Sequence, residues 1–135
     1  MHARGIAYRE RRDYDRAVAD FDTALKLDPK FTLGYVDRGN AYQHKGDYDR
    51  AIHDYDQAIK LDPKNSLAFS NRGLAHKAKG DLARAIADFD QAIKLNPLYG
   101  NAYTNRSGAK RAAGDKAGAD ADQAKARDLL KANLK

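Results

Sequence analysis

The chain contains no cysteine and no tryptophan, and it has only three prolines in 135 residues. The absence of cysteine excludes a disulfide framework, a thiol nucleophile and thiolate metal ligands, although it does not identify a compartment. No apolar run approaches the roughly 18 residues that a membrane-spanning helix needs. The first residues also lack the apolar core of a secretion signal. The fold must therefore depend on packing alone, and we expect a cytoplasmic protein with no membrane association and no cofactor.

The residues that are present, 42% hydrophobic and 33% charged, are typical of one foldable domain. The net charge of +6 is unevenly distributed, because residues 1–31 carry +1, 32–65 carry −1, 66–99 carry +2 and 100–135 carry +4. Recognition of single-stranded nucleic acid needs aromatic side chains interleaved with basic ones, and the last segment offers only Tyr103. We therefore expect no nucleic-acid partner, but a preference for acidic peptides that weakens with salt.

The sequence repeats itself every 34 residues. A fixed period of this length is the sign of a repeat architecture. The columns that share it are Gly5, Gly39 and Gly73; Asp13, Asp47, Asp81 and Asp115; Ala17, Ala51, Ala85 and Ala119; and Pro29, Pro63 and Pro97. We therefore divide the single domain 1–135 into a truncated first unit (1–31), two complete units (32–65 and 66–99) and a degenerate capping unit (100–135).

Each unit is predicted to be a helical hairpin. In the second unit the apolar residues from Ala51 to Leu61 recur at steps of three and four, which is the period of one helix face. Gly46 suits the end of one helix and Asp47 the cap of the next, while Pro63 ends the second helix. One hairpin of this length cannot bury its apolar face alone, so successive units must stack.

Glycine inside the first helix of a unit needs a steric reason, because it costs about 1 kcal/mol relative to alanine. We expect Gly39 and Gly73 to allow close approach of two helix backbones, with the large aromatic residues filling the space around them. Ser107 is expected to substitute for this packing glycine in the last unit.

These columns resemble the signature of the tetratricopeptide repeat family. The matching positions are Tyr35, Gly39, Tyr42, Ala51, Tyr55 and Pro63, and then Phe69, Gly73, Ala85, Phe89 and Pro97. The resemblance implies an all-α fold, a right-handed superhelix (solenoid) of about four antiparallel helix-turn-helix hairpins whose first helices line a concave groove. It also implies a scaffold for protein interactions, a step from fold to function that is analogy.

The chain departs from the family at the position before the glycine, where arginine replaces leucine in every unit. An aspartate column on the second helices has the same period. We predict a structural ladder of partly buried pairs that joins Arg4, Arg38, Arg72 and Arg106 to Asp20, Asp54, Asp88 and Asp122. The alternative is solvated charges, since exposed ion pairs contribute only about 0–1 kcal/mol.

The resemblance also locates a candidate peptide-binding set on the groove side of the first helices. It comprises Asp37, Asn40, Gln43, His44, Asn71, Lys77, Asn105 and Arg111. An asparagine amide both donates and accepts hydrogen bonds, so it can hold a peptide backbone. Asn71 and Asn105 resemble the asparagine ladder of the sugar-transferase relatives, and the alternative is that they are merely solvated. The terminal-carboxylate clamp of chaperone-tail relatives is incomplete, because Val36, Asn101 and Asn105 occupy its basic positions.

Catalytic and metal-binding patterns are absent from the sequence. The four histidines show no paired spacing on one helix face, which disfavours a metal site. Ser107 and Lys110 have the SxxK spacing of one enzyme class, but its companion motifs are missing. We expect no enzymatic activity.

A second hypothesis is a structural repeat array that mediates self-assembly or spaces other domains, as a fragment of a larger protein. A third is an engineered sequence, because the three clean units are close to a consensus. Leu129, Leu130 and Leu134 give the last helix an apolar face. It either packs back on the third hairpin or forms a homodimer through terminal helices. The sequence does not identify the partner or its peptide motif.

Overall fold

The computed structural model of the chain describes the backbone of residues 2–134 and the side chains of residues 11–132. The described backbone forms seven α-helices, which are α1 (His2–Leu27), α2 (Thr32–His44), α3 (Tyr48–Leu61), α4 (Ser66–Ala78), α5 (Leu82–Leu95), α6 (Gly100–Ala112) and α7 (Lys116–Leu134). Within this described part, none of the helices combines the length and the apolar character that a bilayer crossing requires.

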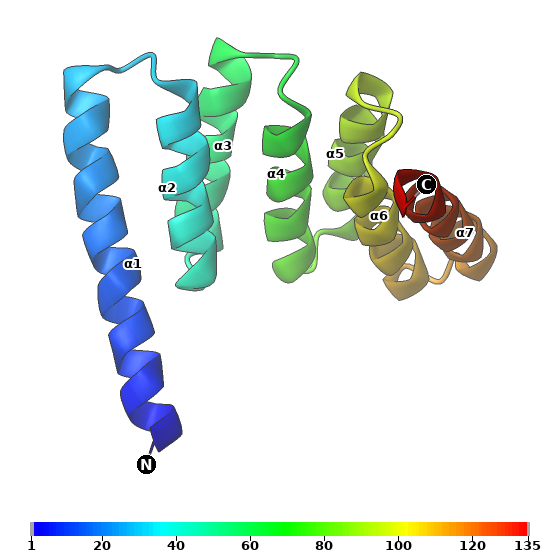
Figure 1. The fold of residues 1–135 in the computed structure, drawn as a ribbon, viewed down its shortest axis with the longest axis horizontal. Helices are drawn as coiled ribbons and strands as arrows, with labels where there is room; N and C mark the ends of the chain where they lie inside the picture. Colours follow the sequence, from blue (N-terminus) through cyan, green and yellow to red (C-terminus); the bar gives the residue numbers. More distant parts are fainter. Residues whose placement is uncertain (1, 135) are drawn as a thin grey trace. The chain divides into compact units, whose positions relative to one another are not determined.

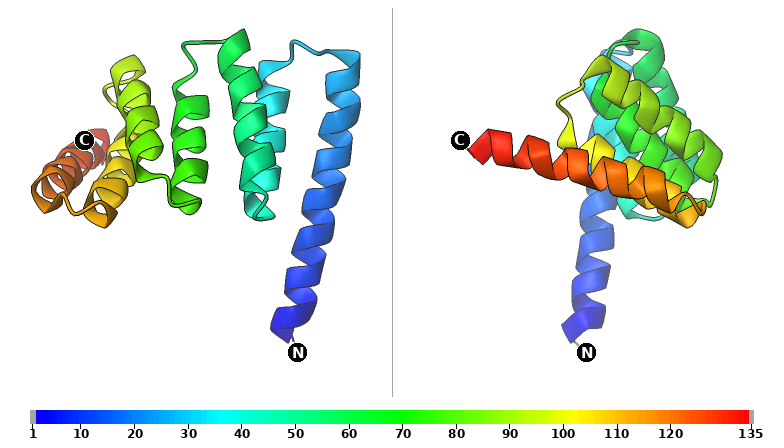
Figure 2. Two further views of the ribbon diagram at one scale, coloured as in Figure 1. Left: turned by 180° about the vertical axis from the view of Figure 1, so that it is seen from behind. Right: turned by 90° about the vertical axis from the view of Figure 1, so that its right-hand side faces the viewer.

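The helices fall into two compact units, Met1–Pro63 and Lys64–Lys135. In unit 1, α2 packs against both α1 and α3; in unit 2, each helix from α4 to α7 packs on the next, and α4 also touches α6. The same order within each unit is visible from the front in Figure 1 and from behind in Figure 2. The expected all-α array of helical hairpins is therefore confirmed. That residues 1–135 form a single domain stays a prediction.

The turn inside each hairpin depends on a glycine in the left-handed conformation. Gly46, Gly80 and Gly114 have φ values of 83°, 85° and 93°, a region that side chains with a Cβ rarely enter. The turn closes because the Asp47 N–H donates to the Tyr42 carbonyl at 2.9 Å, as in a Schellman motif. The next helix starts directly afterwards, since the Asp47 carboxylate accepts from the Arg50 N–H.

The first repeat differs from the prediction, because α1 is one continuous helix of 26 residues. Arg12 stands one period before Gly46, so the residue needed for the left-handed turn is missing. A non-glycine residue would lose about 1–2 kcal/mol in that conformation, and the helix continues instead. Within the predicted truncated first unit (1–31), α1 is therefore continuous through the position of the hairpin turn, and it extends well past the end of α2 (Figure 1).

The glycine inside each first helix makes room for an aromatic ring of the second helix. A Cβ on Gly39 would lie 2.7 Å from Cε1 of Tyr55, and a Cβ on Gly73 would lie 2.7 Å from Cε1 of Phe89. The expectation that two backbones meet at these glycines is therefore wrong; a ring lies between them. In the last hairpin Ser107 is buried at the equivalent position, because the aromatic residue is replaced there by an exposed glutamine.

We expect Gly73→Ala to destabilise the protein by up to about 2 kcal/mol. Overpacking costs about 1–3 kcal/mol, and the gain in helix propensity returns about 1 kcal/mol. Chemical denaturation measures the free energy of unfolding. The control is Gly100→Ala, where the nearest atom lies 4.0 Å from the new Cβ.

The double variant G73A/F89L should lose less stability than the two single changes added together, because the smaller side chain relieves the clash. A G73A variant as stable as G100A would show that the ring can move aside.

Candidate functional site

The predicted binding residues lie on the first helices of the three hairpins. Asp37, Asn40, Gln43 and His44 are on α2; Asn71 and Lys77 are on α4; Asn105 and Arg111 are on α6. Because α4 and α6 contact each other in unit 2, they form one face, which we call the unit 2 face and define by Asn71, Lys77 and Asn105.

In unit 1 most of the predicted residues already have internal partners. The Tyr55 hydroxyl lies 2.6 Å from Asn40 Oδ1 and 2.8 Å from Gln43 Oε1, and it can donate its single proton to either oxygen. The His44 ring stacks on Tyr14 of α1 with ring centroids 5.0 Å apart. Asp37 is half-buried, and this burial raises the pKa of its carboxyl. These side chains therefore contribute to the packing of unit 1, and their role in binding stays a prediction.

In unit 2 the predicted residues divide into two groups. Arg111 is committed to α7, because its guanidinium donates to Asp120 at 2.8 Å and to Gln123 at 3.0 Å. The Lys77 ammonium instead reaches across to α6, where it lies 2.7 Å from the position that a Cβ on Gly108 would occupy. Glycine at position 108 leaves room for the end of this flexible side chain.

The half-buried Lys77 has no carboxylate within ion-pair distance among the described residues, and Asn105 is half-buried on the neighbouring helix. A cation and amides on two adjacent helices can bind a peptide that carries negative charge.

The arginine column forms charged pairs between the two helices of each hairpin. The pairs are Arg38 with Asp54, Arg72 with Asp88, and Arg106 with Asp122, each joined by two hydrogen bonds of 2.6–2.9 Å. The three aspartates are buried, and a bidentate arginine is the donor that best satisfies a buried carboxylate. The fourth pair is not observed, since the Arg4 side chain lies outside the described residues and Asp20 is exposed.

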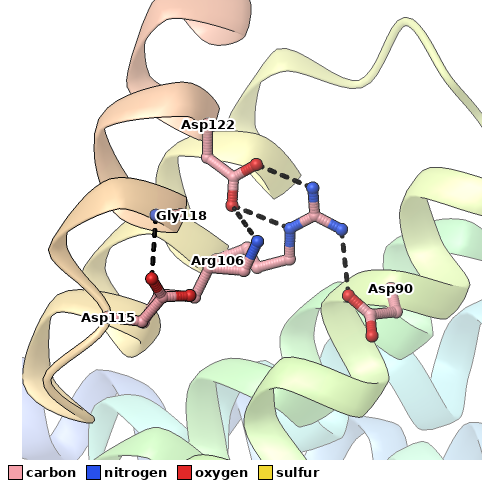
Figure 3. Close-up of polar contacts among 6 residues, drawn as sticks. Asp90, Arg106, Asp115, Gly118 and Asp122 are labelled. Carbon is pink, nitrogen blue, oxygen red and sulfur yellow. Dashed lines mark hydrogen bonds and ion pairs between the residues drawn. The ribbon is translucent and has the colours of Figure 1, made fainter.

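Arg38 and Arg106 also bind a second carboxylate on the preceding helix. Arg38 donates to Asp22 of α1 at 2.8 Å. Arg106 donates to Asp90 of α5 at 2.9 Å, as Figure 3 shows together with its bonds to Asp122. Each guanidinium therefore connects three helices. The sequence prediction missed this column, although Asp22, Asp56 and Asp90 share the period of 34 residues.

The other polar candidates have structural surroundings. His76 lies 3.8 Å from Asp88, and burial is the main cause that lowers its pKa. Ser107 is buried, and Lys110 pairs with Asp122 at 3.2 Å. Within the described residues there is no cluster of histidines and carboxylates that could hold a metal ion.

Comparison with known proteins agrees with this architecture. Models described as "Tetratricopeptide repeat" match residues 2–31, 66–99 and 21–53, and one described as "TPR repeat" matches residues 39–80. The second TPR of Spaghetti (RPAP3), solved with HSP90 peptide SRMEEVD, is 31% identical with a TM-score of 0.72, over 75% of this chain and 94% of that chain.

The chain belongs to the tetratricopeptide repeat family. The first TPR domain of human RPAP3 is 32% identical with a TM-score of 0.73, over 75% of this TPR chain and 80% of that chain. MamA from Desulfovibrio magneticus RS-1 is 24% identical with a TM-score of 0.82, over 95% of this chain and 72% of that chain, which shows a shared fold. No curated protein sequence matches the chain.

We expect Arg38→Met to destabilise unit 1 by about 3 kcal/mol, because it leaves the Asp54 carboxylate buried without its bidentate partner. Urea unfolding followed by circular dichroism measures this loss. Arg50→Met is the matched control, since its ion pair with Asp47 is exposed and should be worth at most about 1 kcal/mol. The variant R38M/D54L should recover most of this stability. If the free energy of unfolding of R38M is as high as that of R50M, the pair has no structural role.

Acid should remove the contribution of Asp122. Burial raises the pKa of this carboxyl, but hydrogen bonds from Arg106 and Lys110 outweigh burial, and the pKa is below its usual value. A lowered pKa gives stability that is complete above about pH 4, the unfolded value, and is lost as pH falls through the folded pKa. Asp122→Asn should therefore be less stable than the original chain at pH 7, and the difference between them should be smaller at about pH 3, below the unfolded pKa.

The exposed Asp120→Asn is the control for this comparison, and urea unfolding at both pH values is the measurement. A stability gap for D122N that stays constant with pH would show that the charge of Asp122 contributes nothing.

Proposed function

We propose that this TPR chain is a protein-interaction scaffold that binds an extended, acidic peptide segment on the unit 2 face, without catalysis and without a metal. The observation that carries the proposal is the half-buried Lys77, which lies over Gly108 with no carboxylate partner in the described part of the chain. Asn71 lies on the same helix as Lys77, and Asn105 lies one period later on α6.

The relatives support this kind of ligand. The RPAP3 domain was solved with HSP90 peptide SRMEEVD, a sequence with more acidic than basic residues. In this chain, however, Asn101 and Asn105 occupy positions where the resemblance expects basic residues. We therefore propose recognition of an acidic internal segment, in place of a terminal carboxylate.

A purely structural array is the alternative function, and unit 1 favours it. Asn40, Gln43 and His44 are engaged by Tyr55 and Tyr14. An array whose first helices bind nothing would space other domains or assemble with copies of itself. In that case Lys77 would be a solvated cation.

A peptide array distinguishes the two functions. We expect the full chain to bind a subset of immobilised 15-residue peptides that is enriched in acidic residues, with affinity that falls as salt increases. The variant K77A/N105A should lose about tenfold or more in affinity while its helicity and melting temperature stay unchanged.

The matched control is Lys94→Ala on α5, which removes one exposed positive charge from a second helix. If no peptide binds, or if K94A weakens binding as much as K77A/N105A, the unit 2 face is not a binding site. A change in oligomeric state on replacing Leu129 and Leu130, seen by light scattering, would then favour the structural array.

A further inference from the structure

The last hairpin, α6–α7, carries an open cleft between the start of α6 and the final turns of α7. The cleft has a volume of about 380 Å³. Leu98 and Leu130 line it, and these residues are 73% and 61% exposed. Leu129 and Gly100 also line it, together with the polar side chains of Asn96, Asn101 and Thr104.

Both exposed leucines depart from the repeat. One and two periods before Leu98 the sequence has Lys64 and Lys30, and the positions before Leu130 hold Asn96, Asp62 and Asp28. Two positions that are polar in the other units have therefore become apolar on the same cleft. Exposed apolar side chains gathered in one place indicate a contact surface, and a solvated end needs none of them.

In the preceding hairpin, α4–α5, the surface equivalent to this cleft is covered by the next helix, α6. Phe89 of α5 is fully buried and packs in one cluster with Ala109 of α6. One period later the equivalent of Phe89 is Gln123, which is exposed and lines the adjoining part of the cleft with Ala126 and Leu130. The register of the repeat therefore identifies a helix as the occupant, because α6 is the element that packs on α5.

The charge of the surface changes between the two hairpins. On α5, Asp90 receives Arg106 of α6 at 2.9 Å. On α7 that position is Ala124, and Arg127 replaces Ile93 and lines the adjoining pocket that shares Ala126 and Leu130 with the cleft. If a first helix with the sequence of α2, α4 or α6 packed on α7, its arginine would meet Ala124 where α5 has Asp90. It would also lie near the positive charge of Arg127. A helix with acidic residues is complementary to it.

We propose that this cleft binds an amphipathic helix from a partner protein, which places an apolar side chain between Leu98 and Leu130 and a carboxylate against Arg127. The partner helix lies on α7 in the way that α6 lies on α5. This contact is separate from peptide binding on the unit 2 face, since it uses none of Asn71, Lys77 or Asn105.

Two fluorescent peptides test the proposal. Both contain residues 97–113, the segment that occupies the equivalent position on α5, and both are held helical by a side-chain staple. One keeps the natural sequence, and the other carries R106E and K110E. In fluorescence anisotropy the acidic peptide should bind the full chain at least about tenfold more tightly than the natural peptide.

Variants of the full chain locate the contact. R127E should reverse the preference between the two peptides, whereas K125E, which changes a neighbouring exposed residue of α7, should preserve it. L130Q should weaken binding of the acidic peptide about tenfold. A124D/R127I, which restores the charge pattern of α5, should bind the natural peptide more tightly than the original chain does.

The variant K77A/N105A should bind the acidic peptide unchanged, so failure of this proposal is distinguishable from failure of the proposed function. Equal binding of the two peptides, or a preference that R127E leaves unaltered, would overturn it. A dimer in light scattering that L130Q dissociates would also overturn it, because a second copy would then be the occupant.

Discussion

The hairpins α2–α3 and α4–α5 depend on one packing contact, in which an aromatic ring of the second helix lies against a glycine of the first helix. The rings of Tyr55 and Phe89 lie where a side chain on Gly39 or Gly73 would have to be. This contact fixes the distance between the two helices, and that distance allows each arginine to reach a buried aspartate. Where the aromatic residue is lost, Ser107 replaces glycine and the ion pair is kept. The charged pair therefore tolerates the change of packing in the last hairpin.

The arginines have a second role, because they bind a carboxylate on the preceding helix as well as one on the second helix of their own hairpin. Arg38 and Arg106 each satisfy one carboxylate inside the hairpin and one on the helix before it. A leucine at this position could contribute packing to the core, but it could not select a neighbour by charge. The chain thus encodes the order of its helices in paired charges, and on α7 the acidic partner is replaced by Ala124. The surface at that end consequently differs in charge from the one before it.

The period of 34 residues was enough to predict the helices, the turn glycines, the caps and the arginine–aspartate pairs, because each depends on residue type at a fixed spacing. The long α1 was predictable only by reading Arg12 as the loss of the turn glycine. The contacts of Asn40, Gln43 and His44 were not predictable, because a polar side chain on a helix face gives no sign of an internal partner. The open cleft follows from Leu98 and Leu130 only after their positions in space are known.

The continuous α1 has a mechanical consequence. At about 1.5 Å per residue its 26 residues span about 39 Å, twice the length of the 13-residue α2 that packs against it. The long helix behaves as a rigid strut, because a helix bends little without proline, glycine pairs or an interrupted hydrogen-bond ladder. Rotation of α2 by a few degrees would move the far tip of that strut by several ångströms. With arginine in place of the turn glycine, the first repeat has one long helix that can act as a lever arm where the other repeats have a hairpin turn.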